Sequence, residues 1–259
     1  MLFYEHRMMR QEPGLHAVIA EKTDVPIPTI VAHDFSHDRI DRDYVVMNRM
    51  PGAPMSEQPS LSPTAIERVL CEVGRSLRAV HAITVDRHGY LGEHEPMPSQ
   101  KDWPSAFSIM WHELIDDIEA CNGYRPSEAL KMRRMLETHL HVFDRPVSAA
   151  LLHMDVWAQN ILCDEQGQLS CLLDWDRALY GDPEIEFAVL DYCGISEPPF
   201  WQGYGKVRDT SPEAEIRRTF YLLYEMQKYI VIRKVRNRDA AGADRYRLQS
   251  LQLAQSLSN

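Results

Sequence analysis

The 259-residue sequence lacks a long apolar run, a Cys-x-x-Cys pair and any excess of basic residues. No stretch is apolar over the roughly 18 residues that a membrane helix needs, and no signal peptide is recognisable. The five cysteines are an odd number without metal-site spacing, so neither a zinc site nor a disulfide framework is predicted. The formal net charge of -10 argues against nucleic acid as a partner. We therefore expect a soluble, cytoplasmic protein with reduced thiols.

The composition is that of an ordinary globular protein. Apolar residues make up 44% of the chain and charged residues 25%, which is enough to build a buried core. The length allows one large domain or two lobes that share a cleft. The negative charge would weakly favour a cationic small molecule, although many soluble proteins are acidic without such a partner.

The first fifty residues predict a small mixed unit. Periodicity predicts a helix over residues 9–22, and Pro13 is acceptable only in its first turn. Apolar and β-branched residues predict strands over 29–32 and 43–50. The Pro-Gly-Ala-Pro run at 51–54 is a strong signal for a turn that ends regular secondary structure. It predicts a boundary between a first unit, residues 1–50 with a hinge at 47–52, and a second unit, residues 51–259.

The second unit is predicted to be mainly helical. Ser62 and Pro63 are typical of a helix start, and the apolar face that follows continues to Val80. The other expected helices cover 105–120, 126–142, 183–192, 212–235 and 243–257, a strand covers 149–152, and a hairpin covers 160–163 and 169–174.

The most informative segment follows the strand at 149–152. It reads His-Met-Asp-Val-Trp-Ala-Gln-Asn over residues 153–160, and a Leu-Asp-Trp-Asp run follows at 173–176. Asp155 on a loop can orient a substrate hydroxyl, while Asn160 and Asp174 offer oxygen ligands for Mg²⁺. This is the set of groups that phosphoryl transfer from a nucleotide requires.

Other interpretations of the segment remain open. A loop aspartate is often a turn or cap residue, and an asparagine five residues later is unremarkable by itself. A metallohydrolase site built on His153 and Asp155 is also conceivable, but no second histidine cluster lies nearby in sequence. The combination of strand, loop, hairpin and second aspartate favours phosphoryl transfer.

These motifs resemble the catalytic core of the aminoglycoside phosphotransferase family, which has the two-lobed protein-kinase-like fold. The matching segments are 152–155, 160–162, 173–176 and 181–183, with weaker matches at 25–28, 44–52 and 74–81. The resemblance extends from residue 7 to about residue 230. It implies an α+β fold with a mainly helical second lobe, and a kinase that uses ATP or GTP with Mg²⁺.

The resemblance also implies roles for single residues. Asp155 would be the catalytic aspartate, and Asn160 and Asp174 the Mg²⁺ ligands. His153 would brace the loop, and Asp182 and Glu186 would be structural. The residues implied in nucleotide binding are Met47, Asn48, Met50 and Glu12, of which Asn48 and Met50 would use backbone groups.

The acceptor is less well defined by the sequence. Asp176 and the helical residues Glu113, Asp116 and Asp117 could attract an amine-bearing small molecule, and Glu119 lies on the same helix. The alternative is that these residues form a solvated helix face. Members of the resembled family phosphorylate several kinds of hydroxyl compound, so an aminoglycoside does not follow.

One part of the family pattern is missing before Glu12. Only eleven residues precede it, and they contain no glycine and no lysine, so nothing there resembles the Gly-rich hairpin and Lys strand that grip a triphosphate. Either the parent protein is longer, or the chain is an impaired kinase-like binding module. In both cases we expect a thin first lobe with exposed apolar surface, which predicts a homodimer through that lobe.

Overall fold

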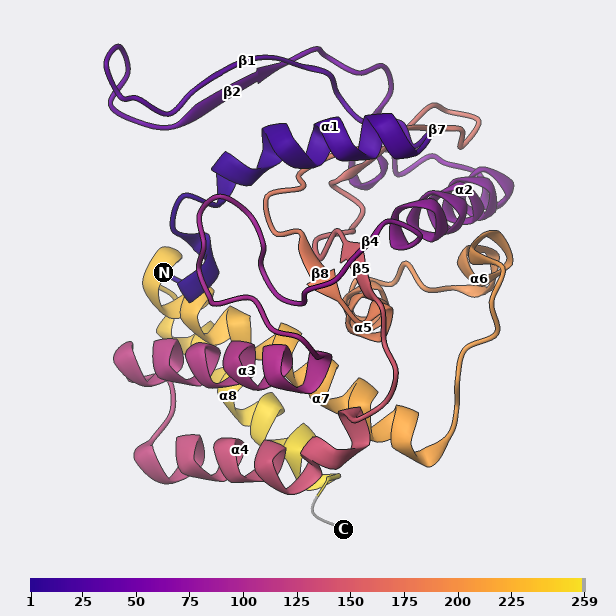
Figure 1. Ribbon diagram of the computed structural model, residues 1–259. Helices are drawn as coiled ribbons and strands as arrows, with labels where there is room; N and C mark the ends of the chain where they lie inside the picture. Colours follow the sequence, from indigo (N-terminus) through magenta and orange to yellow (C-terminus); the bar gives the residue numbers. More distant parts are fainter. Residues whose placement is uncertain (258–259) are drawn as a thin grey trace.

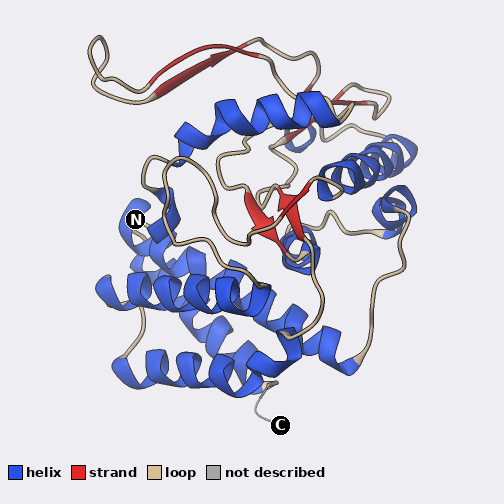
Figure 2. Cartoon of the chain, viewed as in Figure 1, coloured by secondary structure: helices blue, strands red, loops and turns tan. Residues whose placement is uncertain are grey.

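The computed structural model describes residues 1–257 as a helical body that carries three small antiparallel sheets (Figures 1 and 2). The helices are α1 (Glu12–Lys22), α2 (Pro63–His81), α3 (Trp103–Ala120), α4 (Pro126–His139), α5 (Pro183–Tyr192), α6 (Pro198–Tyr204), α7 (Pro212–Val231) and α8 (Ala240–Gln255). The strands are β1 (Ile30–Asp34), β2 (Tyr44–Met47), β3 (Ala53–Pro54), β4 (Thr84–Val85), β5 (Ala149–Leu152), β6 (Ile161–Cys163), β7 (Leu169–Leu172) and β8 (Leu179–Gly181).

The elements form two layers around a central set of short strands. Helices α3, α4, α7 and α8 make the lower body in Figure 1, and the α2–α6 pair lies beside the strands. Helix α1 and the β1–β2 hairpin lie above them. Two buried apolar clusters hold these parts together, one within the lower body and one between α1, α2, α6 and the central strands.

The central strands fix the position of the segment after residue 152. Strand β5 is the middle strand of the β4-β5-β8 sheet, in which Ala150 pairs with Gly181 and Leu152 with Leu179. The β6–β7 hairpin pairs Ile161 with Leu172. The chain between β5 and β6 is therefore short and held at both ends.

Local sequence explains where several helices begin. The side chains of Ser62, Asp102 and Ser211 accept hydrogen bonds from first-turn N–H groups of α2, α3 and α7, at 3.2, 2.8 and 3.3 Å. A proline follows each cap within two residues, where its missing N–H has no intrahelical partner to lose. Gly203 of α6 allows close packing on α2, because a Cβ there would collide with the carbonyl oxygen of Cys71.

Most predicted elements occur, with shifted ends. The helix predicted over 9–22 begins only at Glu12, because Pro13 then falls in the first turn, and Met8–Gln11 forms a 3₁₀ turn instead. The strand predicted over 43–50 is shortened to β2. Helices predicted to reach 142 and 235 leave α geometry at His139 and Val231, and continue as a 3₁₀ turn and a π-helical turn. Four short elements, α6, β3, β4 and β8, are not predicted by the sequence patterns.

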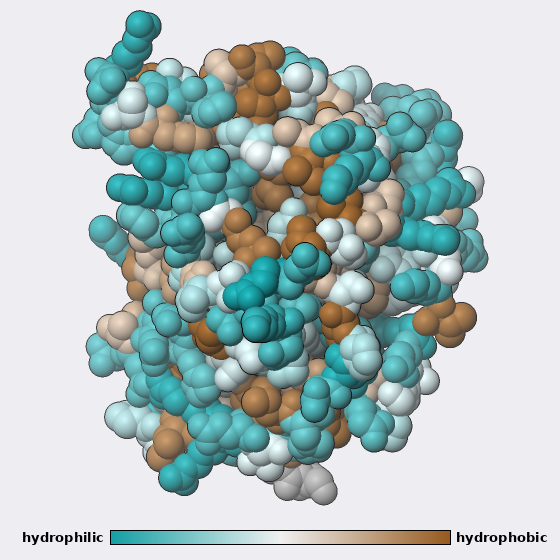
Figure 3. Space-filling model, in the orientation of Figure 1, coloured by the Kyte–Doolittle hydropathy of each residue, from teal (hydrophilic) through white to brown (hydrophobic). Residues whose placement is uncertain are grey.

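The expectation that residues 1–50 are poorly covered holds only for the hairpin. Leu2, Tyr4 and Ile19 are buried against the rest of the chain. In contrast, Val31 is 64% exposed, and Val46 of the facing strand is also exposed. Figure 3 shows a mainly hydrophilic face with scattered apolar groups. No helix within residues 1–257 has both the length and the hydropathy to cross a membrane.

Candidate active site

One buried carboxylate, on helix α5, fixes the loop that follows β5. Glu186 of α5 accepts hydrogen bonds from the backbone N–H of His153 (3.2 Å) and of Met154 (2.7 Å). Met154 has a positive φ of 66°, so the chain turns sharply there. The hydrogen bonds from Glu186 hold that turn in place.

His153 braces the same loop from its other side. Its Nε2 lies 2.9 Å from the carbonyl oxygen of Leu173, which can only accept, so Nε2 carries the proton. Its Nδ1 then accepts the backbone N–H of Asp155 at 3.3 Å. The buried ring thus connects the loop to the end of the β6–β7 hairpin.

These braces present Asp155 beside Asn160. The side-chain amide of Asn160 donates to the backbone oxygen of Asp155 at 2.9 Å and to its Oδ2 at 3.2 Å. The guanidinium of Arg177 lies 2.9 Å from the other carboxylate oxygen. Burial raises the pKa of Asp155, and the positive charge of Arg177 partly offsets this effect. The carboxylate is therefore fixed in one orientation.

Asp174 lies next to this pair at the end of the hairpin. The N–H of Leu173 donates to the carbonyl oxygen of Asn160 at 2.9 Å, which brings the following residue alongside. Asp174 is exposed and has a positive φ of 68°. Its side chain forms a hydrogen bond with that of Asp176 and also faces solvent. Two oxygen-bearing side chains, those of Asn160 and Asp174, thus flank the two strands of one hairpin.

Two more carboxyl groups, those of Glu12 and Asp176, complete an acidic region around Asp174. Burial, followed by the charge of Asp174, raises the pKa of Asp176 to about 8 and that of Glu12 to about 7. The nearest basic group to Glu12 is His16, whose Nε2 lies 3.7 Å from Glu12 Oε2. Within residues 1–257 no set of three or more His, Cys, Asp or Glu side chains is arranged to hold a metal unaided. The positive charge of Arg177 partly offsets the rise in the pKa of Asp176, and a bound cation would offset it further.

Replacing Glu12 by Gln tests the unfavourable burial of the Glu12 carboxylate beside the charge of Asp174. The folded protein holds the Glu12 proton more tightly than the unfolded chain does, so stability is lost as the pH rises from about 4.5 to about 7. We expect Glu12→Gln to raise the free energy of unfolding by about 2 to 3 kcal/mol at pH 8, and by much less at pH 5. Urea unfolding at both pH values measures this, with the exposed Glu21→Gln on the same helix as the control. An equal change at both pH values would contradict the expectation.

The residues implied in nucleotide binding lie where β2 ends. The N–H of Asn48 is already used, because it donates to the carbonyl oxygen of Thr29 at 3.0 Å. Within the described chain, the Asn48 carbonyl and the Met50 N–H have no hydrogen-bond partner. Met47 is 37% exposed. These two backbone groups form an acceptor–donor pair suited to the edge of a purine.

The acidic residues of α3 do not act as one group. Asp116 forms an ion pair with Arg133 of α4, and Glu119 lies 2.7 Å from the same guanidinium. Asp117 instead accepts the backbone N–H of Phe3 at 2.6 Å, and burial raises its pKa to about 6. Glu113 is exposed. Asp116 and Asp117 therefore have different partners.

Asp182 lies apart from this site and caps α5. Its side chain accepts the N–H of Glu184 at 3.1 Å and the hydroxyl proton of Tyr221 at 2.9 Å. Arg145 completes its partners at 2.6 Å.

The sequence analysis missed two features of the site. The first is Arg177, which directly follows the Asp-Trp-Asp run but has no spacing signal that would pair it with Asp155. The second is a buried group around Tyr4, whose ring stacks on Tyr90 at 5.0 Å. The ammonium of Lys228 lies 5.7 Å from the Tyr4 ring and 2.7 Å from Glu225. Two opposite charges only three positions apart in the mainly apolar second half of α7 were the available signal.

A family profile described as "Phosphotransferase enzyme family" matches residues 4–215. The chain belongs to this family. The prediction of a phosphotransferase is thereby confirmed at the level of the family, and the resemblance to the aminoglycoside phosphotransferases is confirmed with it.

Several relatives of this phosphotransferase are named as kinases. A "Probable ketoamine kinase" of Vibrio cholerae is 27% identical over 221 residues, which are 81% of this chain and 69% of that protein. The chloroplastic protein-ribulosamine 3-kinase of Oryza sativa is 35% identical over 163 residues, 59% of this chain and 46% of that protein. Hygromycin-B 4-O-kinase of Escherichia coli is 24% identical over 175 residues, 64% of this chain and 47% of that protein. The chain thus spans about half of the rice and Escherichia coli proteins.

Solved structures confirm the predicted fold class. An apo form of a thermostable mutant of aminoglycoside phosphotransferase APH(4)-Ia has a TM-score of 0.70 at 18% identity, covering 96% of this chain and 83% of that one. The GDP complex of aminoglycoside 2'-phosphotransferase-IIIa has a TM-score of 0.65 at 15% identity, covering 96% and 81%. The fold is the mixed, protein-kinase-like fold of these enzymes.

Proposed function

We propose that this chain transfers the terminal phosphoryl group of ATP or GTP to a hydroxyl group of a small, amine-bearing molecule. The observation that carries the proposal is the Asp155 carboxylate, fixed by Asn160 and Arg177 beside the exposed Asp174. Phosphoryl transfer depends mostly on positioning and electrostatics, and this arrangement supplies both.

Each side chain of the site has a role in this proposal. Asp155 accepts a hydrogen bond from the acceptor hydroxyl and orients it. Asn160 and Asp174 would hold Mg²⁺, which neutralises charge on the phosphates when it is bound. The carboxyl groups of Glu12 and Asp176, whose pKa values are raised to about 7 and about 8, support a cation there. Their protonation removes the repulsion that a metal ion would also remove.

The nucleotide base belongs at the end of β2 in this proposal. The Asn48 carbonyl accepts from an exocyclic amine, the Met50 N–H donates to a ring nitrogen, and Met47 packs on the ring. Residues 1–50 would then cover the nucleotide from above, and residues 51–259 would carry Asp155 and the metal ligands, with the hinge at 47–52.

The acceptor class rests on chemistry and on the relatives' names. Ketoamine, protein-ribulosamine and hygromycin B are the substrates that those names print, and all carry both hydroxyl groups and nitrogen. Glu113 is exposed and has no side-chain hydrogen bond or ion pair within residues 1–257, so it is the acidic group of α3 that is free for a cationic acceptor. In contrast, Asp116 is held by Arg133 and Asp117 by the N–H of Phe3. The five free cysteines suit a reducing compartment such as the cytoplasm.

Nucleotide binding by the intact chain tests the proposal. Calorimetry with ATP and Mg²⁺ should show saturable binding by the wild-type chain. Asp174→Ala should weaken it by about tenfold or more, because a charged metal ligand is lost. The exposed Asp86→Ala, remote in sequence from the site, should bind as the wild type does. If the wild-type chain does not bind ATP with Mg²⁺, the proposal fails for this polypeptide.

A second candidate function is a kinase-like binding module without transfer activity. It is favoured by Glu12, which has no lysine or arginine partner within residues 1–257, while Arg10 is bound to Asp43 at 2.8 Å. Such a module would bind an amine-bearing small molecule without releasing ADP or GDP. Product release in the presence of an acceptor therefore distinguishes the two functions.

Homodimerisation through the first fifty residues is part of the proposal. The β1–β2 hairpin is a two-stranded sheet with exposed Val31, Ile40 and Val46. We expect concentration-dependent dimers in sedimentation velocity, and a monomer when Val31 and Val46 are both replaced by Lys. A wild-type monomer at high concentration would contradict this.

A further inference from the structure

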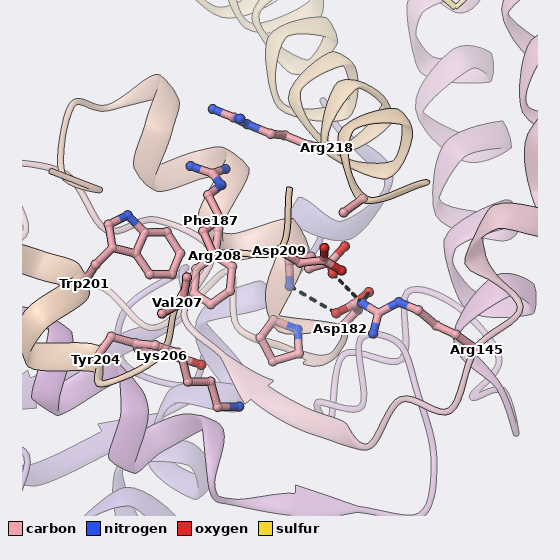
Figure 4. Close-up of a pocket in the computed structure, with 13 residues that line it drawn as sticks. Arg145, Asp182, Phe187, Trp201, Tyr204, Lys206, Val207, Arg208, Asp209 and Arg218 are labelled. Carbon is pink, nitrogen blue, oxygen red and sulfur yellow. Dashed lines mark hydrogen bonds and ion pairs between the residues drawn. The ribbon is translucent and has the colours of Figure 1, made fainter. Parts of the chain in front are cut away.

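A cavity of about 220 Å³ lies between α5, α6 and the segment that joins α6 to α7 (Figure 4). One wall is aromatic: Phe187 of α5 meets Trp201 and Tyr204 of α6, with ring centroids 4.9 and 5.1 Å apart. The rim carries Val207, which is 97% exposed. Val207 thus adds an apolar side chain to the mouth of a cavity whose wall is aromatic.

This cavity is separate from the Asp155 site. Strand β8 runs antiparallel to β5, so Gly181 lies beside Ala150 near the start of β5. Asp182, the next residue, lines the cavity. Asp155 follows the other end of β5, and none of the residues proposed to hold nucleotide, metal or acceptor lines the cavity.

The charged groups of the lining are paired, with one exception. Arg145 is held by Asp182 and Glu184, and both Arg208 and Arg218 are held by Asp191. The exposed Lys206 has neither a hydrogen bond nor an ion pair with any other residue of the described chain. The lining therefore combines one unpaired positive charge with three aromatic rings.

We propose that this cavity binds a small aromatic carboxylate. The ring of the ligand packs on Trp201 and Phe187 and covers Val207, while its carboxylate pairs with Lys206. A volume of about 220 Å³ is below the roughly 300–1,000 Å³ of pockets for drug-sized ligands, so a single ring is the fitting size.

The cavity is connected to the loop of Asp155 by hydrogen bonds. The Tyr204 hydroxyl lies 2.8 Å from Nδ1 of His81, and Nε2 of His81 lies 2.7 Å from Glu186. Glu186 holds the N–H groups of His153 and Met154. A ligand that moves Tyr204 is therefore expected to change the hydrogen bonds that hold the loop. Any effect of this change on catalysis rests on the proposed function.

Equilibrium dialysis of the full chain with radiolabelled benzoate tests the binding. We expect one saturable site, weakened about threefold to fivefold by Lys206→Gln. Loss of ring stacking in Trp201→Leu should weaken it about tenfold. The exposed Lys101→Gln should change nothing, and unlabelled benzamide should compete less well than benzoate. No saturable binding, or equal binding by all four proteins, would overturn the proposal.

Amide hydrogen exchange tests the connection without nucleotide or acceptor. Benzoate should change exchange at His153 and Met154 in the wild type, but not in Tyr204→Phe, which retains the ring and the binding. Unchanged exchange in the wild type would refute the connection. Benzoate binding by a chain that fails to bind ATP would instead count against the proposed function alone.

Discussion

Asp155→Asn is expected to lower the rate of phosphoryl transfer by about 10² to 10⁴-fold. The amide has nearly the shape of the carboxylate, but it cannot accept a proton and is a poorer partner for the acceptor hydroxyl. It also removes the charge that Arg177 contacts at 2.9 Å. Release of ADP, measured with a ribulosamine-bearing amine and with hygromycin B as acceptors, reads out the effect.

Binding data separate this role from a structural one. Affinity for ATP with Mg²⁺ should stay within about twofold, because Asn160 and Asp174 are retained. The exposed Asp86→Asn serves as the control and should keep full activity. If Asp155→Asn transfers phosphoryl groups as fast as the wild type, Asp155 is not the residue that orients the acceptor.

Glu186→Gln is expected to destabilise the folded chain by about 3 to 5 kcal/mol. Glu186 is fully buried and receives three hydrogen bonds, from His81 and from the N–H groups of His153 and Met154. The amide NH₂ of glutamine cannot accept, so at least one of these buried donors loses its partner. In a chain of this size, thermal unfolding should occur about 10 °C lower.

The pH dependence of stability gives a second measure of Glu186. Burial is the largest single influence and would raise its pKa, but the interactions with His81, His153 and the N–H of Met154 together outweigh burial and lower it. A lowered carboxyl pKa stabilises the fold above the unfolded-state value, and this stabilisation is lost as the pH falls through the folded-state value. The variant should therefore lose less stability than the wild type on acidification below about pH 4.5. Glu165→Gln, in the exposed turn of the β6–β7 hairpin, is the control, and a wild-type melting temperature for Glu186→Gln would contradict the prediction.

The sequence predicted the position of the loop that carries Asp155 because its signals are local. Proline and cap residues mark the helix starts, as at Ser62 and Pro63, and the predicted bounds of α5 and β5 match the structure. The spacing of Asp155, Asn160 and Asp174 follows from a strand, a loop and a hairpin that are neighbours along the chain. Such short-range geometry leaves few alternatives, so the residues could be named before the fold was described.

Long-range contacts set the limits of that prediction. Arg177 meets Asp155 across 22 positions, and Glu186 meets the Asp155 loop across more than 30. Asp116 and Asp117 look equivalent on a helix, but one contacts Arg133 and the other the backbone of Phe3. Packing of distant elements decides such pairings, and no local spacing encodes it.

By itself, the sequence determined the family, the fold class and the identity of the acidic and amide groups of the site. Only the tertiary structure decided which charges are paired. It left Glu12 without a lysine or arginine partner within residues 1–257, gave Asp155 an arginine, and left Lys206 unpaired beside an aromatic cavity. The physical reason is that the state of a charge depends on burial and on neighbours within a few ångströms, and these come together only when remote segments pack.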